Sequence, residues 1–131
     1  MNISFADIVW IDKGQILMLG VLGILIVLDV LSGLMKAFKN KCFKSSKMRD
    51  GLFRKLSYFI VLGVALLLDD TGEVLNLGFD IPIFAPAAIY IVFMEVTSIL
   101  ENAVAIEPRL GGNRLLGLFM SKNSEQIDEA G

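Results

Sequence analysis

Two carboxylates stand inside long apolar runs of the sequence. Asp29 lies in the run 15–35, and Glu95 lies in the run 81–100. Acids in apolar surroundings are costly unless they are paired, so they are candidates for proton relay, for pore lining or for structural pairing. The sequence has no His and one Cys, Cys42, so the usual general base and clusters of cysteine ligands are missing. We find no nucleophile–base pair and predict that the chain is not an enzyme and binds no metal.

Polar and small residues share defined faces of a helix over the first run. From Asp29 a polar stripe continues at i+3, i+4 and i+7 through Ser32, Gly33 and Lys36. Gly20 and Gly23 lie on the opposite face. Small residues let helix backbones approach closely in lipid, so we expect helix packing or self-association through Gly20, Gly23 and Gly33. Ordinary packing within one chain explains the glycines equally well.

A second polar face is expected around Glu95. The bases Arg54 and Lys55 begin the middle apolar run at a similar depth, so we expect them to pair with the acids at rest. The alternative is a wet surface that lines a pore once copies assemble. The predicted intramembrane polar and gating residues are Asp29, Ser32, Glu95, Ser98, Glu101 and Asn102.

These residues require membrane-spanning elements to position them. The chain has 131 residues, 55% of them hydrophobic, and a mean hydropathy of +0.68, which is typical of a membrane protein. We predict an all-α protein with three transmembrane helices, over about 15–35, 56–68 and 81–100. In the first span, thirteen Leu, Ile or Val residues contribute about −4 to −8 kcal/mol to the free energy of membrane insertion, against about +3 kcal/mol for Asp29. Insertion is therefore favoured. The second span is short, and Glu95 weakens the third.

Charge distribution predicts the orientation. Eight of the twelve bases form a predicted cytoplasmic basic loop, namely Lys36, Lys39, Lys41, Lys44, Lys47, Arg49, Arg54 and Lys55. The N-terminus and an acidic loop over 69–80 then lie outside, and the C-terminus lies inside. The basic loop should contact an anionic inner leaflet, whereas nucleic acid is an improbable partner for a loop held at both ends. We divide the chain into a transmembrane domain, 1–110, and a tail, 111–131, with a short amphipathic helix at 113–120.

Several stretches together resemble the toxin-secretion and phage-lysis holin family. They are 29–33 (DVLSG), 36–40 (KAFKN), 45–55 (SSKMRDGLFRK) and 95–102 (EVTSILEN), followed by Pro108. The resemblance covers roughly residues 15–110, and its strength comes from the order and spacing of these stretches between apolar runs.

The resemblance implies a holin of the bacterial cytoplasmic membrane, with no enzymatic activity and no cofactor. Such a protein oligomerises with itself into non-selective lesions that release an endolysin or a large toxin without stable contact, and an antiholin is a candidate partner. Two other functions stay open. A small proton-coupled channel or transporter subunit would give ion-selective flux, and a membrane anchor or scaffold would give no pore.

Overall fold

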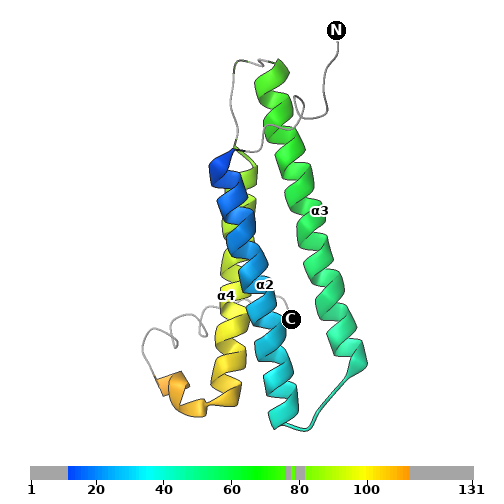
Figure 1. Cartoon of the computed structure of the whole chain (residues 1–131), viewed down its shortest axis with the longest axis vertical. Helices are drawn as coiled ribbons and strands as arrows, with labels where there is room; N and C mark the ends of the chain where they lie inside the picture. Colours follow the sequence, from blue (N-terminus) through cyan, green and yellow to red (C-terminus); the bar gives the residue numbers. More distant parts are fainter. Residues whose placement is uncertain (1–11, 76–77, 79–81, 113–131) are drawn as a thin grey trace, which may run out of the picture. The chain divides into compact units, whose positions relative to one another are not determined.

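The computed structural model describes residues 12–75, 78 and 82–112, and within these residues every regular element is helical (Figure 1). The elements are α2 (Lys13–Lys39), α3 (Ser45–Leu75), α4 (Phe84–Ile106) and the short 3-10 helix η1 (Pro108–Gly112). The prediction of an all-helical protein is confirmed for this part of the chain.

Each of the three α-helices is long and apolar enough to cross a membrane. Even α4, the shortest with 23 residues, is about 35 Å long at about 1.5 Å per residue, which exceeds a hydrocarbon core of about 30 Å. In the most apolar stretches of α2, α3 and α4 only 11%, 17% and 11% of the residues are buried. A helix in water would bury its apolar face, so these exposed aliphatic surfaces suit contact with lipid.

The second helix is much longer than the apolar run that predicted it. The run 56–68 forms the middle of α3, which begins at Ser45 and ends at Leu75. Arg54 and Asp69 bound the apolar run but lie inside the helix. Charged residues lower hydropathy without preventing a helical backbone, and Arg is among the better helix formers. The other two predicted spans correspond to α2 and α4.

Contacts divide the chain into two compact units. The first comprises Met1–Gly23 and Ser45–Val92, and the second comprises Ile24–Lys44 and Phe93–Gly131. In the first unit, parts of all three helices pack around a small apolar core of Leu22, Leu62, Ala65, Phe84, Ala88 and Ile91. The second unit contains the C-terminal parts of α2 and α4 together with η1.

The predicted basic loop is much shorter in the structure. Only residues 40–44 separate α2 from α3, and of the eight bases only Lys41 and Lys44 lie there. Lys36 and Lys39 belong to the end of α2, where basic side chains interact favourably with the helix dipole. The other four bases belong to the N-terminal half of α3, namely Lys47, Arg49, Arg54 and Lys55.

The predicted acidic loop is also shortened by α3. This helix continues from Asp69 to Leu75, so the first half of the stretch 69–80 is helical. The amphipathic helix predicted at 113–120 lies outside the described residues.

Candidate functional site

Three charged side chains are buried in the described part of the chain: Asp29 of α2, Lys55 of α3 and Glu95 of α4. Their exposed fractions are 6%, 5% and 1%. Each takes part in an interaction, so none is an isolated buried charge. An unpaired charge in hydrocarbon costs several kcal/mol, and burial therefore separates these groups from lipid. All three are candidate residues predicted from the sequence, and the expected pairing of the acids with bases stays a prediction.

In the second unit, Asn102 of α4 joins Asp29 and Ser32 of α2 in what we call the Asn102 cluster. Asn102 Nδ2 donates to Asp29 Oδ1 at 3.2 Å and to Ser32 Oγ at 3.1 Å. The Ser32 hydroxyl donates in turn to the Asp29 carbonyl oxygen at 3.0 Å. An amide group carries two donors, one for each acceptor, so a single side chain can link α4 to two residues of α2.

Gly33 lies against this cluster. A Cβ atom at Gly33 would lie 3.7 Å from Asn102 Nδ2, which is ordinary van der Waals contact. Side chains larger than alanine would therefore compete with the amide for space. Gly33 thus contacts its own chain, as expected for a small residue between closely packed helices.

The other predicted polar residues of α4 are also withdrawn from full exposure. Glu95 is buried, and Ser98, Glu101 and Asn102 are each half-buried. Glu95, Ser98 and Asn102 follow the i, i+3, i+7 spacing of one helical face. Thr97 differs, because its hydroxyl donates to the Phe93 carbonyl of its own helix at 2.8 Å.

Gly20 and Gly23 behave differently from Gly33. A Cβ atom at either position would have no atom within 4 Å. Their surroundings on α2 are exposed aliphatic side chains, among them Leu17, Ile24 and Val27. Packing within the described chain therefore gives no reason for these two small residues, and their role in self-association stays a prediction.

The bases of the chain have unequal surroundings. Lys39 donates from its amino group to the carbonyl oxygen of Ile106, at the C-terminal end of α4. Lysine at this position satisfies a carbonyl that has no partner within the helix and faces the negative end of the helix dipole. On α3, Lys55 is buried whereas its neighbour Arg54 is exposed. Lys41, Lys44, Lys47 and Arg49 are exposed as well, and Lys36 is half-buried.

Asp69 has a structural role that was not predicted from the sequence. Its Oδ1 accepts from Ile83 N at 2.7 Å, and its Oδ2 accepts from Phe84 N at 3.0 Å. These amides stand at the start of α4, where the first N–H groups lack helical partners. A carboxylate at the N-terminus also interacts favourably with the helix dipole. The only available signal was the position of an acid directly after an apolar run.

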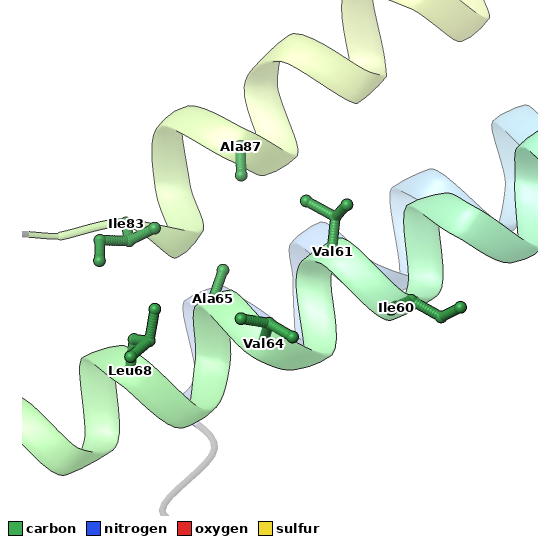
Figure 2. A pocket seen from close by; sticks show the side chains of 7 residues that line it. All are labelled: Ile60, Val61, Val64, Ala65, Leu68, Ile83 and Ala87. Atoms are coloured by element: carbon green, nitrogen blue, oxygen red, sulfur yellow. The ribbon is translucent and has the colours of Figure 1, made fainter.

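An apolar groove of about 260 Å³ lies in the first unit between α3 and α4 (Figure 2). Figure 2 shows its lining residues, which are Ile60, Val61, Val64, Ala65, Leu68, Ile83 and Ala87. All seven are aliphatic, so the groove offers no group for acid–base or nucleophilic chemistry. Among the described residues there is also no cluster of three or more His, Cys, Asp or Glu side chains that could hold a metal ion.

Three lipid-compatible helices that sequester a few polar side chains define a class of protein, the multi-pass helical membrane proteins. Within this class, residues 8–111 match the bacteriophage holin family, and the chain belongs to that family. The resemblance found in the sequence is thereby confirmed. The holin family is not a family of enzymes. No curated protein and no solved structure matches the chain.

Proposed function

We propose that this holin oligomerises in the cytoplasmic membrane of a bacterial host and forms non-selective lesions. An endolysin or a large toxin would leave the cell through these lesions. The N-terminus would lie outside and the C-terminus inside, because the bases of residues 36–55 favour the cytoplasmic side. The partners in this proposal are other copies of the chain and the membrane lipids, and an antiholin is a candidate regulator.

One observation carries this proposal. Asp29 and Ser32 of α2 bond to Asn102 of their own chain, whereas a Cβ atom at Gly20 or Gly23 would meet no other atom of the described residues within 4 Å. A single copy therefore presents lipid with an apolar surface and keeps its polar groups from lipid. The open space beside Gly20 and Gly23 offers a place where a second helix can approach closely.

We infer a switch between two states from this arrangement. In the resting state the Asn102 cluster and the buried charges are closed to water. In a crowded assembly, α2 and α4 separate at the cluster and their polar faces line an aqueous edge. A charge that crosses the whole membrane potential contributes about 2.3 kcal/mol per 100 mV, so partial displacement of Asp29 or Glu95 would make the switch sensitive to depolarisation.

The decisive experiment uses full-length protein in liposomes of bacterial lipid, loaded with both K⁺ and a labelled folded protein. We expect no release at low protein density and abrupt release of both contents above a threshold density. Release of ions alone at every density would indicate a channel or transporter subunit. Release of neither would indicate an anchor or scaffold. Either result would refute the proposed lesion.

The proposed orientation of the chain in the membrane can be tested separately by labelling a thiol. Cys42 is exposed and is the single cysteine of the sequence. A membrane-impermeant maleimide should label Cys42 in inverted vesicles and not in intact spheroplasts. The opposite pattern would reverse the proposed orientation.

A further inference from the structure

The end of α2 forms a defined turn that holds a lysine in an unusual conformation. Lys41 N donates to the Phe38 carbonyl at 3.3 Å, and Cys42 N donates to the Ala37 carbonyl at 3.1 Å. These two hydrogen bonds form a Schellman motif, whose C′ residue adopts the left-handed conformation. That residue is Lys41, with φ of 50°. Glycine is the residue that favours this conformation, so the turn itself gives no reason for a lysine.

Two aromatic rings are exposed beside this lysine. Phe38 and Phe43 contact each other edge to face, with ring centroids 5.6 Å apart and an interplanar angle of 87°. Their exposed fractions are 76% and 59%, so the pair is not part of the apolar core. Exposed phenyl groups next to lysines, at the end of a membrane-spanning helix, are suited to the boundary between headgroups and acyl chains.

We call residues 36–44 the basic turn. Its four lysines divide into two groups. Lys39 is engaged by the Ile106 carbonyl and Lys36 is half-buried, whereas Lys41 and Lys44 are exposed. No acid occurs in the sequence between Asp29 and Asp50, so nothing local along the chain offsets these charges. Two exposed lysines therefore lie within three residues of Phe38 or Phe43 in the sequence.

We propose that the basic turn is a binding site for anionic phospholipid. Lys41 and Lys44 contact the headgroup phosphates, and the rings of Phe38 and Phe43 enter the adjacent interface. Charge complementarity selects this ligand, because an anionic leaflet attracts juxtamembrane bases at short range. The position agrees, since the turn directly follows a helix that is long enough to span the membrane. The site requires only that the protein resides in a membrane, so it is independent of lesion formation.

The test is native mass spectrometry of the full-length protein in detergent, titrated with phosphatidylglycerol or with zwitterionic phosphatidylcholine. We expect the wild type to prefer phosphatidylglycerol. Lys41→Gly removes the charge and favours the same turn, so loss of preference cannot be assigned to a broken turn. The contribution of each base near an anionic surface predicts about a fivefold loss of preference for Lys41→Gly or Lys44→Gln, and about a 30-fold loss for both together.

The matched control is Arg109→Gln, which removes one base from the same unit. Arg109 is exposed and already paired with Glu107, with Nε and Oε1 3.4 Å apart. Its substitution should change the preference less than twofold. Unchanged preference in the Lys41→Gly/Lys44→Gln double variant, or an equal loss with Arg109→Gln, would overturn the proposed site. Displacement of the lipid by inorganic phosphate at equal concentration would also overturn it, since the ligand would then be a free anion.

Discussion

Replacing Asn102 by leucine should make the protein open its lesions earlier. The substitution keeps a similar volume and removes the two hydrogen bonds to α2, at 3.2 Å and 3.1 Å. A hydrogen bond between membrane helices contributes about 0.6 kcal/mol on average and about 1.7 kcal/mol at most. Two such bonds therefore stabilise the closed state by about 1 to 3 kcal/mol. Because 1.4 kcal/mol is a factor of ten, the ratio of closed to open copies should fall by about fivefold to about 100-fold.

The assay is the time of sudden loss of turbidity after induction, in cells that also express an endolysin without a secretion signal. Thr97→Val is the matched control, since it removes a hydroxyl of α4 whose hydrogen bond goes to the Phe93 carbonyl of the same helix. We expect lysis by the Asn102→Leu variant to come earlier than lysis by the wild type, and lysis by Thr97→Val at the normal time. Equal timing of Asn102→Leu and wild type, at equal protein levels, would refute the assignment of the Asn102 cluster as a closing contact.

Three further predictions follow from the other polar and small residues. Glu95→Gln should advance lysis and weaken its triggering by an uncoupler, because the membrane potential loses a buried charge through which it favours the closed state. Glu107→Gln, at an exposed position, is the control, and a normal uncoupler response in the Glu95 variant would exclude that role. Asp69→Ala should lower the free energy of unfolding, measured by thermal unfolding in detergent, by about 1 to 3 kcal/mol, and Asp69→Asn should lower it by less. Equal stability of Asp69→Ala and wild type would show that the hydrogen bonds of Asp69 to the start of α4 are dispensable. The Gly20→Leu/Gly23→Leu double variant should abolish crosslinked oligomers and lysis while leaving the free energy of unfolding unchanged. The control is Gly63→Leu on α3, where a Cβ atom would likewise have no described atom within 4 Å. Oligomers of normal size in the double variant would rule out these glycines as a contact between copies.

The number and approximate positions of the helices could be predicted because insertion depends on local composition. The run 15–35 lies within α2, and most of 81–100 lies within α4. The ends of α3 could not be predicted in this way. Hydropathy falls at Lys55 and Asp69, but a helix ends where its backbone hydrogen bonds end, and Ser45 and Leu75 lie well beyond the apolar run.

The candidate residues were predicted individually, but their partners were not. Helical spacing placed Asp29 and Ser32 on one face, and separately placed Asn102 with Glu95. Which face of α4 meets which face of α2 depends on the rotation of each helix about its axis, which packing decides. For the same reason, sequence spacing alone could not separate Gly33 from Gly20. A Cβ atom at Gly33 would contact Asn102, whereas one at Gly20 would have no described atom within 4 Å.

The size of the closing contact bears directly on whether such a protein can act as a timed switch. Two interhelical hydrogen bonds hold α2 to α4 at the Asn102 cluster, and their combined contribution of about 1 to 3 kcal/mol is similar to the effect of 100 mV on one displaced charge, about 2.3 kcal/mol. A contact of this strength keeps most isolated copies closed. It can still be overcome when the potential collapses or when neighbouring helices add a few kcal/mol of packing. The hydrogen bonds that Asn102 donates to a carboxylate and a hydroxyl therefore have a strength that suits a reversible closure.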